Sequence, residues 1–290
     1  MFNMTDHPIW RFDDQMPQGR EFAIFHSTKA MLQPSVYHGH SYYEIYFLLQ
    51  GNVQVVVEDQ HWTPVVGDTL IYPPQCMHRM IYTESTQPYE RFYIYLSVEY
   101  LNAISTQDYN FNVELEKLTQ NGNYYFCPGE EAVQELVKRA DEIIDAARND
   151  SPDEVLCNRY RMAMYLIHLL NSLKESVANP SQSIPHRMND LIRYINNNAA
   201  QPLSIEQLGQ VFGLSRSVLM HDFKEYTGMP IYQYILIRRV LLAQELIQKG
   251  MKPGQACKQS GFSDYASFYR IFKARTGQSP NQYSKSLNES

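Results

Sequence analysis

The chain has 290 residues, enough for two domains that each bury a hydrophobic core. Its formal net charge is −6, but residues 185–290 hold 13 Lys and Arg against 7 Asp and Glu, whereas the rest holds 12 against 24. A basic segment joined to an acidic body is typical of a nucleic-acid-binding domain attached to another domain. The four cysteines show no CxxC spacing, which argues against a disulfide framework. The chain opens without a signal segment and has no apolar run of ~18 residues, so we expect a cytoplasmic protein with no membrane partner.

Alternating and β-branched residues in the first third of the chain predict β-strands. The predicted strands cover 44–49, 53–57, 69–72 and 92–96, with turn residues at 50–52, 66–68 and 73–74. Many short strands at this spacing indicate an antiparallel sandwich or barrel. We therefore expect residues 1–115 to form an antiparallel β-barrel.

The hydrophobic period changes to that of helices from residue 130 onwards. Two helices are predicted, at about 130–148 and 153–174. In the second helix four leucines lie one to four residues apart on one side: Leu166, Leu169, Leu170 and Leu173. This stripe is wide enough for a partner helix, so we expect residues 116–175 to mediate homodimerisation. The alternative is that the stripe packs on its own barrel or on the preceding helix.

A pattern of helix, glycine and second helix occurs twice after a polar segment, 176–184, that we expect to be an interdomain linker. Residues 208–224 and 256–273 each contain a short helical stretch, a Gly, a Ser and a second stretch ending in Phe-Lys. This layout presents the second helix to the major groove of DNA. A plain helical bundle is the alternative, but both copies continue into a Thr-Gly segment that leads to a Pro. We therefore expect residues 185–290 to be an all-α DNA-binding domain with helix-turn-helix units at about 204–226 and 253–275.

The outward faces of the two second helices predict the DNA contacts. In the first copy they are Arg216, Ser217, Met220, His221 and Lys224, and in the second Tyr265, Ala266, Tyr269, Arg270 and Lys273. Arg suits guanine edges, Tyr and Ser suit phosphates, and Ala or Met can contact a thymine methyl group. The spacing of Ser204 and Gln207 also predicts a capping box at the start of the first unit.

Segment 185–290 resembles the AraC/XylS family of transcription regulators. The resemblance is carried by Arg-Val-Leu-Leu-Ala at 239–243, Gly-Phe-Ser-Asp at 261–264 and Phe-Lys at 272–273. In that family two helix-turn-helix units joined by a helix insert into adjacent segments of the major groove. The resemblance assigns base reading to Ser217, Met220, His221, Tyr265, Ala266, Tyr269 and Arg270. His221 is a departure, because the family commonly has Arg there.

A second motif lies among the predicted strands. His38, His40 and Glu44 are followed by Gly51, and a Gly-x5-Pro segment at 67–73 leads to His78. The spacing resembles the cupin pattern, in which two His, a Glu and a later His meet inside a small β-barrel. Side chains at i and i+2 of a strand point to the same side, so the first two histidines would share a face. The chain departs from the pattern at position 75, where Gln replaces the usual Gly.

Two kinds of site fit His38, His40, Glu44 and His78. Three imidazoles and a carboxylate suit a divalent metal such as Zn, Fe, Mn or Ni, which is therefore a candidate cofactor. Sensor cupins of AraC-type regulators often use a similar cluster to contact an organic effector without metal. Tyr46 and Tyr93 are the further predicted effector contacts, because aromatic rings with polar tips suit sugar-like ligands. Tyr also simply favours strands, so ordinary packing is the alternative for both.

Taken together, these patterns predict an α+β multidomain protein. We expect a bacterial transcription regulator that binds double-stranded promoter DNA and a small-molecule effector, acts as a homodimer and is not an enzyme. RNA polymerase is a further candidate partner. A metal-dependent cupin enzyme fused to a DNA-binding domain is the main alternative, although no further acid–base pair at recognisable spacing supports it. An effector-free regulator that acts through a protein partner is a third hypothesis, but it leaves the polar cluster unexplained.

Overall fold

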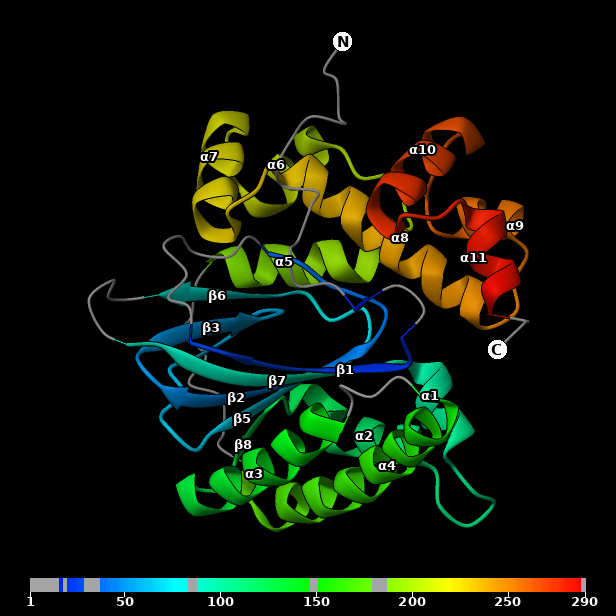
Figure 1. Cartoon of the computed structure of the whole chain (residues 1–290). Coiled ribbons are helices and arrows are strands. Elements are labelled where there is room, and N and C mark those ends of the chain that lie inside the picture. The colour runs from blue at the N-terminus through cyan, green and yellow to red at the C-terminus, as the bar shows by residue number, and fades with distance from the viewer. Residues whose placement is uncertain are drawn as a thin grey trace.

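The computed structural model describes residues 16–17, 20–28, 37–82, 88–146, 151–178 and 187–287. Figure 1 shows the β-strands as a central layer between two groups of helices. Helices from the middle of the chain lie on one side of this layer, and the C-terminal helices lie on the other. None of the described helices has the length and apolar character needed to cross a membrane.

The described residues form two antiparallel sheets. The strands are β1 (Phe22–Ser27), β2 (Tyr43–Gln50), β3 (Val53–Val57), β4 (Gln60–Trp62), β5 (Thr69–Tyr72), β6 (His78–Tyr82), β7 (Glu90–Leu96), β8 (Tyr125–Cys127) and β9 (Val177–Ala178). The six-stranded sheet has the order β1-β7-β2-β5-β8-β9, and the three-stranded sheet has the order β4-β3-β6. The four predicted strands correspond to β2, β3, β5 and β7, so these predictions are confirmed.

The expected barrel does not close. Within the described ranges, no strand of one sheet pairs with a strand of the other. The sheets instead face each other through buried side chains, among them Tyr46, Val55 and Tyr72. Because these large side chains fill the space between the sheets, the edges stay apart and the arrangement is an open sandwich.

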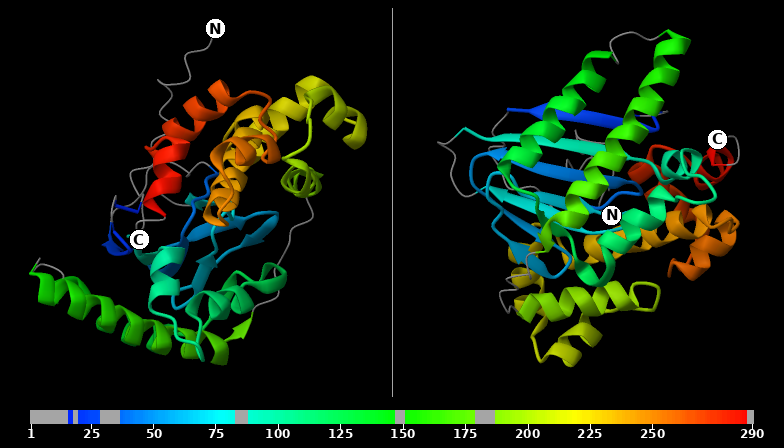
Figure 2. Two further views of the ribbon diagram at one scale, coloured as in Figure 1. Left: turned by 90° about the vertical axis from the view of Figure 1, so that its right-hand side faces the viewer. Right: turned by 90° about the horizontal axis from the view of Figure 1, so that it is seen from below.

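Helices cover the outer face of the six-stranded sheet. They are α1 (Val98–Ala103), α2 (Phe111–Leu118), α3 (Glu130–Ala146) and α4 (Pro152–Glu175), with α3 and α4 side by side in Figure 2. Alternation along β2 directs Ile45 and Phe47 into this helical core, while Tyr46 points between the sheets. The leucine stripe of α4 lies in the same core and is at most 1% exposed. It therefore packs on its own sheet, which is one of the two alternatives that the sequence left open.

Two short strands complicate the expected division of the N-terminal half. β8 falls in the segment 116–175, for which helices alone were predicted, yet it pairs with β5. β9 falls at the start of the expected linker and pairs with β8. The rest of that linker, 179–184, lies outside the described residues.

The C-terminal domain is entirely helical. Its helices are α5 (Arg187–Asn198), α6 (Ile205–Phe212), α7 (Arg216–Thr227), α8 (Ile231–Gln248), α9 (Pro253–Gln259), α10 (Tyr265–Thr276) and α11 (Pro280–Ser286). The pairs α6–α7 and α9–α10 are the predicted helix-turn-helix units, and α8 joins them. The capping box of Ser204 and Gln207 is present at the start of α6. Gly261 has a φ of 89°, and a Cβ there would approach Ala200 O to 2.7 Å, so the second unit requires glycine at its turn.

Candidate functional site

The two recognition helices, α7 and α10, begin in the same way. Ser215 accepts a hydrogen bond from Val218 N, and Asp264 accepts one from Ser267 N at 2.7 Å. Each side chain satisfies a backbone donor of the first turn, which fixes the first residue of the helix. Both helices lie on the side of the C-terminal domain away from the sheets (Figure 1).

All ten predicted DNA contacts are exposed on these helices. They are Arg216, Ser217, Met220, His221, Lys224, Tyr265, Ala266, Tyr269, Arg270 and Lys273. Arg216 forms an ion pair with Glu206, whereas no ion pair with another described residue engages Arg270 or Lys273. Val218 of α7 is also exposed, at 37%, and adds an apolar side chain to the surface of this helix.

The cupin-like residues converge in space. His40 Nε2 lies 3.0 Å from Glu44 Oε2, and His78 Nε2 lies 3.4 Å from the same oxygen. Donor atoms of His38, Glu44 and His78 lie within 4.8 Å of one another. Two backbone hydrogen bonds between His38 and His78, of 2.9 and 2.8 Å, hold the backbone of His38 beside β6. Tyr42 stacks on the His40 ring, and Tyr72 stacks on the His78 ring.

Hydrogen bonds to the backbone determine which imidazole nitrogens face the carboxylate. His40 Nδ1 lies 2.7 Å from Tyr42 O, and His78 Nδ1 lies 3.1 Å from Cys76 O. A carbonyl oxygen only accepts, so both Nδ1 atoms carry the proton. In the neutral tautomer each Nε2 therefore directs a lone pair toward the carboxylate of Glu44. Two acceptor atoms at this distance repel each other unless a proton or a cation lies between them.

Burial and neighbouring charges shift the ionisation of this cluster. Burial lowers the pKa of His40 below 6.5, although its hydrogen bond with Glu44 opposes the change. Burial acts to raise the pKa of Glu44, but the adjacent imidazoles of His40 and His78 hold it well below its usual range. An ionised carboxylate beside imidazole nitrogens is the donor set that a divalent ion prefers. The residues therefore fit the metal that the cupin pattern implies.

His38 and His40 of this cluster line a cavity between the two domains, whereas Glu44 and His78 are not among its lining residues. The cavity has a volume of about 680 Å³ and is lined on the sheet side by the segment 38–42 and on the other side by α8, α10 and α11. Tyr46 and Tyr93 are not among its lining residues. Tyr46 is completely buried between the sheets with its hydroxyl 3.0 Å from that of Tyr89, and Tyr93 is 4% exposed.

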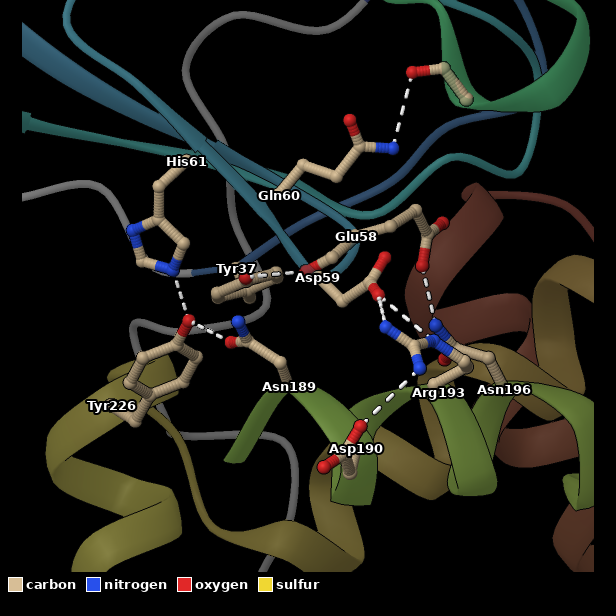
Figure 3. Close-up of polar contacts among 11 residues, drawn as sticks. Tyr37, Glu58, Asp59, Gln60, His61, Asn189, Asp190, Arg193, Asn196 and Tyr226 are labelled. Carbon is tan, nitrogen blue, oxygen red and sulfur yellow. Dashed lines mark hydrogen bonds and ion pairs between the residues drawn. The ribbon is translucent and has the colours of Figure 1, made fainter. Parts of the chain in front are cut away.

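Polar contacts also join the two domains through β3, β4 and the turn between them (Figure 3). Glu58 lies in the turn after β3, where its carboxylate accepts from Met77 N at 2.8 Å and from side chains of Asn196 and Arg238. Asp59 forms an ion pair with Arg193 of α5.

Two further groups of contacts complete the domain interface. The Tyr226 hydroxyl contacts His61 and donates to Asn189, which links the end of α7 to β4. Tyr37 and Met77 share a buried core with Ile192 and Leu241. The N-terminal domain, which contains both sheets and is called the sheet domain below, therefore packs directly on the helices that support the first helix-turn-helix unit, α6–α7.

Sequence reasoning missed these interface residues. Glu58, Arg238 and Arg275 belong to no local motif. The contacts of Arg238 with Glu58 and Gln75, and that of Arg275 with Gly39, join residues more than 160 positions apart in the chain. The one sequence feature that points to this interface is Gln75, at the position where the cupin pattern usually has Gly. Its backbone has a φ of 70°, and its carbonyl oxygen accepts a hydrogen bond from Arg238 at 2.7 Å. The conformation that glycine adopts easily is thus kept with a larger residue.

Comparisons with known proteins agree with both halves of this arrangement. A family model described as an AraC-like ligand binding domain matches residues 25–164, and one described as a helix-turn-helix domain matches 208–286. The chain belongs to the AraC family of transcription regulators. As a member of that family it is a DNA-binding regulator with a ligand-binding domain.

Its relatives are similar over different parts of the chain. It is 26% identical over 174 residues to the probable transcriptional regulator LumQ of Photobacterium leiognathi, over 59% of this chain and 66% of LumQ. It is 22% identical over 246 residues to the uncharacterized regulator YbfI of Bacillus subtilis, over 81% and 82% of the two chains. The solved structure of ToxT from Vibrio cholerae matches 93% of this chain and 99% of ToxT with 11% identity, but its TM-score of 0.38 is too low to indicate a shared arrangement. The AraC-family relatives are regulators, which removes support for the enzyme alternative.

Proposed function

We propose that this AraC-family regulator reads promoter DNA with the ten exposed side chains of α7 and α10, and that a small effector bound beside His38, His40, Glu44 and His78 controls it. The observation that carries the proposal is the position of His38 and His40, because they line a cavity whose other wall belongs to the DNA-binding domain. An effector there contacts both domains. It can therefore favour one arrangement of the domains over another by its difference in affinity.

Selection of operator sequences by the full chain tests the DNA-binding part. Random duplexes enriched by the protein should yield a consensus, and its affinity should fall steeply with salt because basic side chains displace counterions from phosphates. Substitution of Tyr269 or Arg270 should change the consensus at single positions. If no duplex is enriched at low salt, the proposal is wrong.

A divalent metal at the same cluster is a second candidate, supported by the two Nε2 atoms that face Glu44. Ligands held at about 2.0–2.2 Å from one ion lie roughly 3.0–3.4 Å apart, and the separations here are 3.0 and 3.4 Å. His38, Glu44 and His78, whose donor atoms lie within 4.8 Å of one another, would hold the ion, and a bound ion would offer a Lewis-acidic position for an effector oxygen. Elemental analysis of the purified protein tests this, with His78→Ala as the variant that loses the metal.

The leucine stripe of α4 is buried against its own sheet, so the homodimer that the sequence predicts must form through another surface. The outer face of α4 carries Leu156, Tyr160, Met164 and Ile167, which are 43 to 63% exposed and lie three or four residues apart. Figures 1 and 2 show α4 on the side of the sheets opposite the DNA-binding domain, so its exposed face is remote from the recognition helices. A second copy packed on it would leave both recognition helices accessible, and RNA polymerase could then contact the remaining surface. We place this activity in the cytoplasm, where the promoter DNA lies.

A further inference from the structure

The cavity between the domains contains a buried positive charge. Arg275 lies in the last turn of α10, the second recognition helix, and is 9% exposed. Its Nη2 donates to Gly39 O at 2.8 Å, so it reaches from the DNA-binding domain to the segment between His38 and His40. Burial lowers the pKa of Arg275 to about 10, which leaves the guanidinium charged near neutral pH. A guanidinium binds carboxylates and phosphates through parallel N–H bonds.

Other charged groups line the outer part of the cavity. Glu21 is 46% exposed at its side chain and pairs with Arg159 at 3.1 Å. Arg20 is exposed, and Glu99 is partly buried at the start of α1. The deepest of these charges is that of Arg275, and electrostatic attraction is strongest where water is excluded. Arg275 is therefore the least exposed charge among the lining residues, and the ionised carboxylate of Glu44, which is not a lining residue, is 3.0 Å from Nε2 of His40.

Besides these charged groups, His38 and His40, the polar side chains that line the cavity carry amides and hydroxyls. Gln244 and Gln248 come from α8, Thr276 and Gln278 from the end of α10, and Ser41 from the sheet domain. Amide and hydroxyl groups both donate and accept hydrogen bonds, which suits a ligand with several hydroxyl groups. A volume of about 680 Å³ is that of a small-molecule site.

We infer that this cavity binds a small hydroxylated organic anion, whose carboxylate or phosphate contacts Arg275 and whose hydroxyls contact the glutamines. The inference rests on the proposed function and names the class of its effector. Because Arg275 ends a recognition helix and Gly39 lies between two histidines of the cluster, the anion joins the DNA-reading unit to the sheet domain. The difference in its affinity between two arrangements of the domains is then the coupling energy between the ligand and the operator.

Calorimetry on the full chain with three matched probes tests the inference. D-glucuronate carries a carboxylate, D-glucose 6-phosphate carries a phosphate and D-glucose carries neither charge. At equal ionic strength at least one anion should bind with a Kd about tenfold or more below that of glucose. Which of the two binds tells a carboxylate ligand from a phosphate ligand. Arg275→Met should remove this difference, whereas Arg270→Met, on the exposed face of the same helix, should leave it.

Two further variants keep the test decisive if Arg275→Met fails to fold. Arg275→Lys keeps the charge and should retain part of the preference for anions, and Gln248→Leu should weaken the anion about tenfold while the fold is kept. The inference is overturned if glucose binds as tightly as both anions, if neither anion binds at about 10 mM, or if the Arg275 variants bind like the wild type. Operator binding is measured separately. A wild-type protein that binds DNA but no anion overturns this inference alone, whereas one that binds no DNA overturns the proposed function.

Discussion

Arg238 donates to the carboxylate of Glu58 across the domain interface, with its Nη1 3.2 Å from Glu58 Oε1. Arg238 belongs to α8, which joins the two DNA-reading units, and Glu58 belongs to the turn between β3 and β4. Both side chains are less than one fifth exposed. A movement of the sheet domain at this contact would therefore displace α8 and, through it, both helix-turn-helix units.

Glu58→Ala should lower the free energy of unfolding by about 3 kcal/mol, because Arg238 and Met77 N lose a buried acceptor. Arg193→Ala is the matched control at the same interface. Its side chain is 58% exposed, so the loss of its ion pair with Asp59 should change stability by less than ~1 kcal/mol. Urea denaturation measures both values. Equal losses would show that the Glu58 contact contributes no more than an exposed ion pair.

Gln75→Gly should raise the free energy of unfolding by about 1 kcal/mol, because glycine adopts a φ of 70° without strain. The substitution also removes amide atoms that are buried without a hydrogen bond to another described residue. Gln75→Ala is the comparison, since it removes the amide but keeps the strained backbone. If both variants gain equally in thermal denaturation, the strain contributes little.

Arg270→Ala should weaken binding to the selected operator by about 1–3 kcal/mol and relax the preference at one base pair. Lys273→Ala, one turn of helix nearer the C-terminus, should weaken all duplexes alike and reduce the salt dependence by about one counterion. Fluorescence anisotropy with operator and single-base variants separates the two effects. An equal loss on every sequence for the Arg270 variant would assign it to phosphate.

Met164→Glu should convert the dimer to a monomer, because the substitution places a charge in the centre of the exposed apolar face of α4. Lys138→Glu, on the exposed side of α3, should leave the assembly unchanged. Sedimentation at micromolar concentration measures the mass. A wild-type monomer with and without DNA would reject dimerisation through this face.

His40→Ala should abolish the response to effector while operator affinity without effector stays within about twofold, since the cluster lies in another domain from α7 and α10. The response is the change in operator affinity caused by the tightest-binding probe of the calorimetric series. His221→Ala is the converse control, because it lies on the DNA-reading face. Its operator affinity should fall while probe binding is retained. Loss of operator binding in the His40 variant would contradict a role confined to effector sensing.

The sequence alone determined the local structures and the family. The positions of Gly213, Gly261 and the capping box depend on backbone conformation within a few residues, so the helix-turn-helix units were predictable. The strands were predictable from alternation. The spacing of His38, His40 and Glu44 predicted one strand face, but His38 and His40 lie before β2, which begins at Tyr43, and a bend at 41–42 separates them from Glu44. The exposure of the ten DNA contacts follows from the same helical period.

Only the tertiary structure decided how these parts face one another. Whether the leucine stripe of α4 meets a partner or its own sheet depends on a competition for the same apolar surface, and the sheet is nearer. Whether the sheets close depends on which side chains fill the space between them. The cavity depends on Arg275 reaching Gly39, 236 residues away in the chain, and no local pattern encodes a contact of that separation.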